Sequence, residues 1–190
     1  MLSAAREAFR ESGTAAPLDD IARRAGVNIA TLYRRFPDRN TLIREVVLDG
    51  FHFVLAAART ARDTPLDPLT AVEAMLLHFV DNRELLVLPL IGGPSFEDDQ
   101  IVEVQRRIAE ALEDVLAAGR RRGVVREDIN AVDLITTGAL ACRPLPHLPA
   151  EDATALAVRH VRIFVDGLRP AAAHPLPPAV AHDRITRPST

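Results

Sequence analysis

The side chains best suited to bind an anionic polymer lie between positions 28 and 39, in the run NIATLYRRFPDR. Arg34, Arg35 and Arg39 fall within this run, together with Tyr33, the one tyrosine of the chain. A guanidinium group donates forked hydrogen bonds to phosphate or to guanine, and a tyrosine hydroxyl donates to phosphate. A charged helix face that contacts only water would have the same composition, so the elements that carry these side chains decide between the two interpretations.

Two short helices joined by a tight turn are predicted over Leu18 to Arg39. Small apolar residues give the first helix an inner stripe, formed by Ile21, Ala22 and Ala25. Gly26 follows, and glycine tolerates the positive φ at which a helix stops sharply. Asn28 is a good N-cap, because its side-chain oxygen accepts a hydrogen bond from a free backbone N–H of the next helix. This pattern indicates a helix-turn-helix, and a helix over residues 2 to 12, ended by Gly13, completes a three-helix head.

The second helix of this unit begins near Ile29 and presents its cationic residues outward. Leu32 and Phe36 lie four residues apart, so they share one face and anchor the helix to its neighbours. The other faces carry the residues that are free to meet DNA, namely Ala30, Thr31, Tyr33, Arg34 and Arg35.

The run GVNIATLYRRFPDRNTLIREVV resembles the start of the TetR family of transcriptional regulators, whose usual pattern is similar to G-V-S-x-x-T-L-Y-x-H-F-x-x-K-x-x-L. The resemblance covers residues 2 to 47. Three departures keep similar chemistry, since Asn28 replaces serine, Arg35 replaces histidine and Arg39 replaces lysine. Pro17 stands where a serine or threonine that contacts phosphate is common, although proline suits the first turn of a helix.

The resemblance implies a role for each residue of the exposed surface. Contacts with phosphate are implied for Thr31, Tyr33, Arg35 and Arg39. Ala30 and Ile29 are implied to lie against base edges, where an alanine methyl meets the thymine methyl, although Ile29 also suits core packing. Arg34 suits either a guanine or a phosphate. Asn28 belongs to the same predicted DNA-binding surface.

Beyond the head, apolar residues at helical spacing predict a larger helical part. One long helix of about 20 residues begins at Arg39, joins the two parts and ends before the prolines of residues 63–68. Further helices are predicted over residues 69–82 and 96–122. The GGPS run at residues 92–95 is interpreted as a turn.

The last two predicted helices, residues 130–143 and 151–168, indicate a second copy of the chain. No charged residue occurs from Leu134 to Cys142, so this helix is expected to be buried all round. The last helix carries an apolar seam formed by Ala153, Leu156, Ala157, Val161, Phe164 and Leu168. One small domain cannot hide both surfaces, and in the TetR family the last two helices pair with their copies as a four-helix bundle. The proline-rich tail, residues 170–190, is predicted to be disordered.

An effector pocket is predicted among the helices of the second part, because regulators of the resembled family hold small molecules in mostly apolar cavities. The candidates are Met75, His78, Phe79 and Phe96, and each also fits an ordinary core or surface position. The histidines are not spaced for a metal shell and no nucleophile elbow or triad pattern occurs, so no metal site, cofactor or catalysis is predicted. Cys142 is interpreted as an inert buried thiol.

Length and charge set further bounds. The 190 residues suit a small domain on a larger one, with a DNA-binding domain at residues 1–47 and an effector-binding and dimerisation domain at residues 48–169. The formal net charge of −3 confines any nucleic-acid surface to a local patch. No apolar run reaches the roughly 20 residues of a spanning helix, and no signal peptide is recognised. A cytoplasmic protein with no membrane partner is therefore expected.

Together these patterns predict an all-α homodimer that binds a palindromic operator in double-stranded DNA and regulates transcription. The resemblance implies a repressor that a small-molecule effector, whose identity the sequence does not give, releases from DNA. The alternative is a helical ligand-binding or protein-interaction module with weak or lost DNA binding. Pro17 and the nearly neutral first 50 residues favour that alternative.

Overall fold

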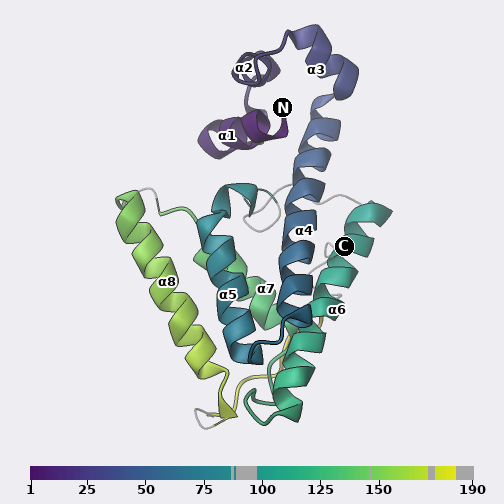
Figure 1. The fold of residues 1–190 in the computed structure, drawn as a ribbon. Helices are drawn as coiled ribbons and strands as arrows, with labels where there is room; N and C mark the ends of the chain where they lie inside the picture. Colours follow the sequence, from purple (N-terminus) through teal and green to yellow (C-terminus); the bar gives the residue numbers. More distant parts are fainter. Residues whose placement is uncertain (87, 89–97, 146, 171–173, 183–190) are drawn as a thin grey trace.

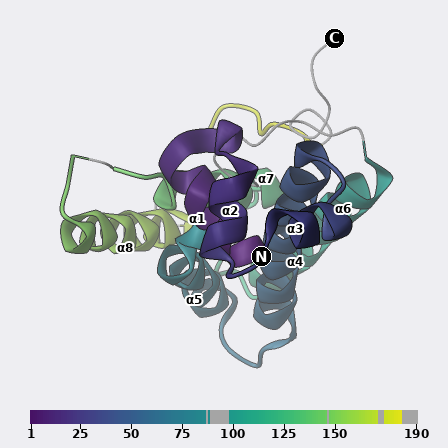
Figure 2. The ribbon, with the colours of Figure 1, turned by 90° about the horizontal axis from the view of Figure 1, so that it is seen from above.

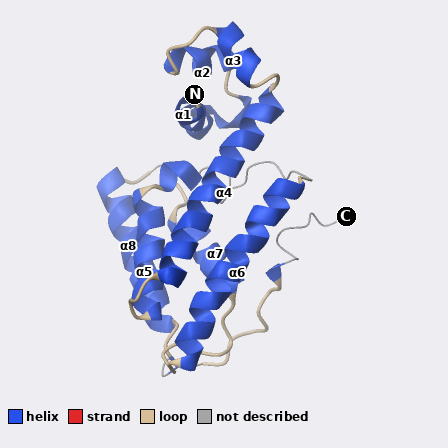
Figure 3. Cartoon of the chain, turned by 45° about the vertical axis from the view of Figure 1, so that its right-hand side comes forward, coloured by secondary structure: helices blue, strands red, loops and turns tan. Residues whose placement is uncertain are grey.

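The structure is a computed structural model that describes residues 1–86, 88, 98–145, 147–170 and 174–182. All regular structure in these residues is helical, which confirms the predicted all-α class (Figure 3). A small head lies at one end of a long helix, α4, and the other helices lie around the remainder of α4 (Figure 1). None of the described helices is long and apolar enough to cross a membrane. The predicted turn at residues 92–95 and Phe96 fall outside the described residues.

The head consists of α1 (Leu2–Ser12), α2 (Leu18–Arg24) and α3 (Ile29–Arg35), which confirms the predicted three-helix unit. A short 3₁₀ turn, η1 (Gly13–Ala15), joins the first two helices. The core of the head contains the apolar side chains that helical periodicity places inward: Ala5, Phe9, Ile21, Leu32 and Phe36. Gly26 has a φ of +68°, and no atom would contact an added Cβ, so the backbone conformation alone selects glycine there. This turn sets the direction in which α3 leaves α2.

The long helix α4 (Arg39–Asp63) connects the head to the rest of the molecule without a break. Its 25 residues exceed the predicted length of about 20 and span about 37 Å at 1.5 Å per residue. Asp38 caps its first turn, where the carboxylate accepts a hydrogen bond from the backbone N–H of Thr41 at 2.7 Å. The predicted domain boundary at residues 47–48 falls inside this helix, so both predicted domains share it.

Two helices, α5 (Pro68–Asp81) and α6 (Asp99–Arg121), pack along α4. A 3₁₀ turn, η2 (Arg83–Leu86), follows α5. Asp98 caps α6 and also accepts a hydrogen bond from Nε of Arg44 on α4 at 2.5 Å. This bond lowers the pKa of Asp98 from its ordinary value. The start of α6 is therefore tied by an ion pair to the part of α4 nearest the head.

The last two helices are α7 (Ala131–Ala141) and α8 (Ala150–Gly167). As the sequence predicts, Asn130 begins α7, and its side chain forms a capping box with Asp133. In two perpendicular views α8 lies at the outer edge of the domain, on the opposite side from α6 (Figures 1 and 2). It packs against α5 and α7.

The expectation that residues 134–142 are buried all round is wrong for the single chain. Leu134 and Gly138 are buried, but Thr136 is exposed and Leu140 is 65% exposed. The reason is that α7 packs against α5, α6 and α8 without being enclosed by them, so a strip of its apolar surface has no partner within the chain.

Part of the tail lies along the protein surface. Residues 174–181 form no regular secondary structure, and carbonyl groups of this segment accept hydrogen bonds from Arg126 at His174 (2.7 Å) and from Asn130 at Val180 (2.8 Å). Arg126 also forms a forked ion pair with Asp128, which lowers the pKa of that carboxyl to about 2. The disorder expected for residues 170–190 stays a prediction.

Candidate DNA-binding surface and ligand groove

The recognition helix α3 is held by one face and displays the other. Leu32 is fully buried and Phe36 nearly so, whereas Tyr33 is 48% exposed. The structure leaves exposed four more residues of the predicted DNA-binding surface: Asn28, Ala30, Arg34 and Arg35. Thr31 and Ile29 are half-buried, and Ile29 packs against the core, in line with the second role that its spacing allows.

Asn28 performs the capping role that the sequence predicts. Its Oδ1 accepts a hydrogen bond from the backbone N–H of Thr31 at 2.7 Å. The carboxamide oxygen is therefore engaged in starting α3, and the amide nitrogen is the group left for a DNA contact.

The arginines of the head differ sharply in whether they are paired. Arg24 donates to Asp20 and Glu11, and these hydrogen bonds lower the pKa of both carboxyl groups. Two further arginines of the head form ion pairs, Arg23 with Asp20 and Arg6 with Asp49 on α4. By contrast, Arg34 and Arg35 form no ion pair within the described part of the chain; the guanidinium of Arg35 lies 5.9 Å from the Phe36 ring centroid. The uncompensated positive charge of the head is thus concentrated on α3.

Arg39 is bound to the backbone of the head and differs in this from the arginines of α3. Its Nη1 donates to the backbone carbonyls of Thr14, at 2.9 Å, and Ala16. Both carbonyls belong to the connection between α1 and α2, so Arg39 fastens the start of α4 to that connection. Its contact with phosphate stays a prediction.

We expect Arg39→Ala to lower the free energy of unfolding by about 1–3 kcal/mol in the absence of DNA, because two carbonyls lose a charged donor. Chemical denaturation measures this. Titration of DNA at several salt concentrations tests the phosphate role separately, since a lost phosphate contact reduces the slope of log K against log salt by about 1. An unchanged slope would assign Arg39 to the fold alone, and Arg39→Lys controls for charge without the forked geometry.

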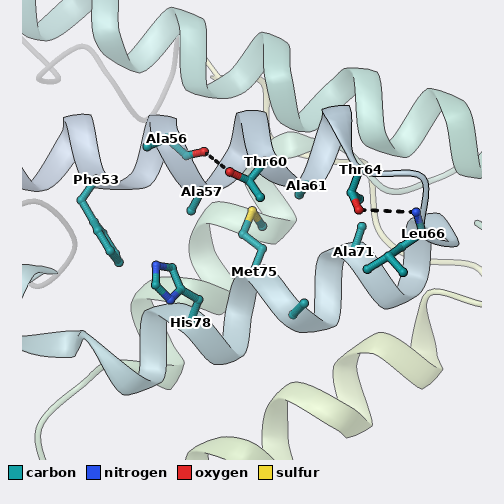
Figure 4. A pocket seen from close by; sticks show the side chains of 11 residues that line it. Phe53, Ala56, Ala57, Thr60, Ala61, Thr64, Leu66, Ala71, Met75 and His78 are labelled. Atoms are coloured by element: carbon teal, nitrogen blue, oxygen red, sulfur yellow. Dashed lines mark hydrogen bonds between the residues drawn. The ribbon is translucent and has the colours of Figure 1, made fainter.

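A groove of about 360 Å³ lies between α4 and α5 (Figure 4). Of the predicted effector residues, Met75 and His78 line it. Phe79 does not line it; its ring packs behind that of Phe53, with centroids 6.0 Å apart, and fills the space beside Gly138 on α7. The fourth candidate, Phe96, lies outside the described residues.

Most residues of the groove lining were not predicted from the sequence. It comes from the second half of α4, the following turn and α5, and comprises Phe53, Ala56, Ala57, Thr60, Ala61, Thr64, Leu66, Ala71 and Ala74. The cluster of alanines at positions 56, 57 and 61 was a usable signal, because small side chains on a helix that faces another helix leave space between them.

A second apolar groove, of about 550 Å³, runs between α7 and α8 on the outside of the molecule. The residues of the predicted apolar seam of α8 differ in whether they line this groove. Val161 and Leu168 are buried within the chain and do not line the groove. Ala157 is buried but lines the groove, as do the remaining seam residues together with Leu140 and Ile163, which is 56% exposed. The lining as a whole is Thr137, Leu140, Ala141, Arg143, Leu145, Ala153, Leu156, Ala157, His160, Ile163 and Phe164.

No cluster of three or more metal-ligating side chains occurs among the described residues. Cys142 is buried, and burial raises the pKa of its thiol to about 12. A thiol with such a pKa stays protonated at neutral pH and is a poor nucleophile and metal ligand.

Comparisons with known proteins agree with this architecture. Residues 1–46 match the family model described as "Bacterial regulatory proteins, tetR family", and residues 67–170 match "Transcriptional regulator SbtR-like, C-terminal domain". The HTH-type transcriptional regulator NfxB of Pseudomonas aeruginosa is 32% identical over 119 residues, which are 61% of this chain; the match spans 63% of NfxB, slightly under two thirds of its length.

Solved structures extend the similarity over nearly the whole chain. The TetR transcriptional regulator SCO0520 of Streptomyces coelicolor is 30% identical, with a TM-score of 0.62, over 90% of this chain and 97% of that one. The TetR-family regulator PfmR of Thermus thermophilus is 26% identical, with a TM-score of 0.59, over 85% and 96% of the two chains.

Proposed function

The chain belongs to the TetR family of DNA-binding transcriptional regulators, and from this premise we propose that it is a homodimeric repressor released from its operator by a small molecule. The DNA-binding part of the proposal rests on which faces of α3 are buried and which are exposed. The apolar face of this helix is buried in the head, and its exposed face holds Tyr33 beside Arg34 and Arg35, which form no ion pair with any residue that the structure describes.

Within this proposal the contacts divide into two groups. Thr31, Tyr33, Arg35 and Arg39 bind phosphates and set the position of α3 on the duplex. Ala30 and Ile29 lie at base edges in the major groove, and Arg34 is in reach of a guanine. Asn28 lies at the margin of this DNA-binding surface. Few residues read bases, so most of the affinity is electrostatic and falls with salt.

The homodimer is supported by the groove between α7 and α8. A large apolar strip on two adjacent helices suits burial against the same strip of a second copy, which a two-fold axis makes self-complementary. Leu140 and Ile163 are its most exposed large side chains. Two copies joined there present two recognition helices to one duplex.

Release by a small molecule is supported by the place of the α4–α5 groove. Its lining includes the second half of α4, the helix whose start Arg39 fastens to the head. Successive major grooves on one face of DNA lie about 34–36 Å apart, so a ligand that tilts α4 misplaces both recognition helices. A coupling free energy of ~1–3 kcal/mol gives a 5- to 150-fold change in operator affinity.

The proposal is tested by selecting bound duplexes from a randomised pool at near-physiological salt and sequencing them. A two-fold palindrome, with half-sites one or more helical turns apart, is the expected result. Recovery of no enriched motif would favour the alternative of a helical interaction module, for which Pro17 is the structural argument: it begins α2 without a side-chain cap.

The same selection with Arg34→Ala tests its role at a base. We expect the preference at one position of each half-site to relax, since a forked contact with guanine discriminates by about 1–3 kcal/mol. Arg35→Ala, at the neighbouring position, is the matched control and is expected to weaken binding to all duplexes about equally. A uniform loss with Arg34→Ala would assign it to phosphate instead.

A further inference from the structure

The groove between α4 and α5 exists because small side chains face each other across it. Its lining includes Ala57 and Ala61 of α4 and Ala71 and Ala74 of α5. Phe53 and His78 lie toward one end of the groove, and Met75 lies near its middle (Figure 4). Its volume of about 360 Å³ is near the lower end of the range for ligand pockets, about 300–1,000 Å³. A compact molecule therefore fits it.

None of the side chains that line the groove carries a fixed charge. An ionised ligand group held there would lose hydration without gaining an ion pair, and this cost is large for a carboxylate or an ammonium. The lining thus selects against charged molecules.

The two hydroxyl groups of the lining differ in what they leave for a ligand. Thr60 donates to the carbonyl of Ala56 at 3.0 Å, and Thr64 accepts from the backbone N–H of Leu66 at 3.5 Å (Figure 4). Thr60 therefore has no hydroxyl hydrogen free for a ligand, whereas Thr64 keeps its hydroxyl hydrogen at the end of the groove away from Phe53 (Figure 4). At the end near Phe53, the imidazole of His78 is the polar side chain of the lining.

The contacts of His78 favour one of its two neutral tautomers. The Nδ2 amide of Asn82 donates to the carbonyl of His78 at 2.9 Å, which fixes the amide orientation, and lies 3.3 Å from Nδ1. An amide nitrogen can only donate, so this contact is a hydrogen bond in the tautomer whose Nδ1 accepts and whose proton is on Nε2. The ring also packs against Phe53, with centroids 5.0 Å apart. No hydrogen bond of Nε2 occurs among the described residues, which leaves it as an oriented donor.

We infer that this groove binds a compact, uncharged, mostly apolar molecule that carries a hydrogen-bond acceptor such as a carbonyl oxygen, and that Nε2–H of His78 recognises this acceptor. The inference rests on the effector role proposed above and specifies the chemical class of the effector.

Three probes of nearly the same shape test separately whether the ligand needs a hydrogen-bond acceptor and whether it must be uncharged. Acetophenone is neutral and carries the acceptor, α-methylstyrene lacks the acceptor, and benzoate carries a charge. Each is titrated into the full chain, and the chemical shift of the Met75 methyl group reports occupancy of the groove. We expect acetophenone to bind about 5- to 10-fold more tightly than α-methylstyrene, the worth of one hydrogen bond, and benzoate to bind at least 10-fold more weakly than acetophenone.

Two variants test the site and the donor. Ala74→Leu fills the groove and is expected to weaken the binding of acetophenone at least 10-fold. Thr70→Leu, at another exposed position of α5 outside the lining, should leave the affinity for acetophenone unchanged. His78→Leu should remove the preference for the ketone over the hydrocarbon while both still bind.

The inference is overturned if benzoate binds as tightly as acetophenone, if the ketone preference survives His78→Leu, or if Met75 does not respond when acetophenone binds. Operator binding is measured in the same samples. If acetophenone fills the groove without weakening the operator complex, the ligand class is supported and effector release is contradicted. If the selection recovers no operator sequence for the chain, only the proposed DNA recognition is contradicted.

Discussion

A chain that carries Leu140→Arg together with Ile163→Arg is expected to be monomeric and to lose at least roughly 100-fold in operator affinity. Both residues lie on the α7–α8 groove and are more than half exposed in the single chain. In a two-fold dimer each substitution appears twice, and four guanidinium groups would have to lose their hydration at an apolar interface. Each recognition helix would then bind its half-site alone and lose the effective-concentration advantage of linkage, which is about 10²–10⁴.

Sedimentation velocity measures the oligomeric state, and fluorescence anisotropy with the selected operator measures the affinity. Val102→Arg is the control, because Val102 is 50% exposed on α6 and lies outside the α7–α8 groove. This variant should sediment and bind like the unaltered chain. A double variant that remains dimeric would place the interface elsewhere.

Adjacent residues of α3 should separate stability from DNA binding. Leu32→Ala is expected to lower the free energy of unfolding by about 2–5 kcal/mol, because it leaves a cavity in the core of the head. Tyr33→Phe removes only a hydroxyl from a half-exposed side chain, so stability should change by less than about 0.5 kcal/mol. Its operator affinity should fall roughly 10-fold or more, since both half-sites lose a hydrogen bond worth about 1 kcal/mol.

Chemical denaturation without DNA and operator titration give the two quantities for each variant. If Tyr33→Phe binds the operator normally, its hydroxyl does not contact phosphate. If Leu32→Ala is as stable as the unaltered chain, the burial of α3 in the head does not stabilise it.

Features set by neighbouring residues in the chain could be predicted from the sequence. The helices of the head, the positive φ of Gly26, the cap at Asn28 and the start of a helix at Asn130 follow from local preferences and were predicted correctly. The family was identified for the same reason, since its motif lies within one short segment.

Features set by contacts between distant segments could not be predicted in this way. Helical spacing places Met75 and Phe79 on the same side of α5, but only the positions of α4 and α7 decide that Met75 lines the groove and Phe79 packs beside Gly138. Likewise, nothing near Arg39 in the chain indicates that its partners are the carbonyls of Thr14 and Ala16. The roles of the individual residues at DNA stay predictions.

The unbroken course of α4 gives the molecule a fixed helical phase between its two ends. One residue added between Val47 and Phe53 would turn the head by about 100° around the helix axis relative to the other helices and shift it by about 1.5 Å. Seven added residues would nearly restore the angle, with an error of about 20°, but would move the head by about 10 Å. Heads exchanged between relatives must therefore be joined in register along this helix, and a change of length here is far more disruptive than the same change in a loop.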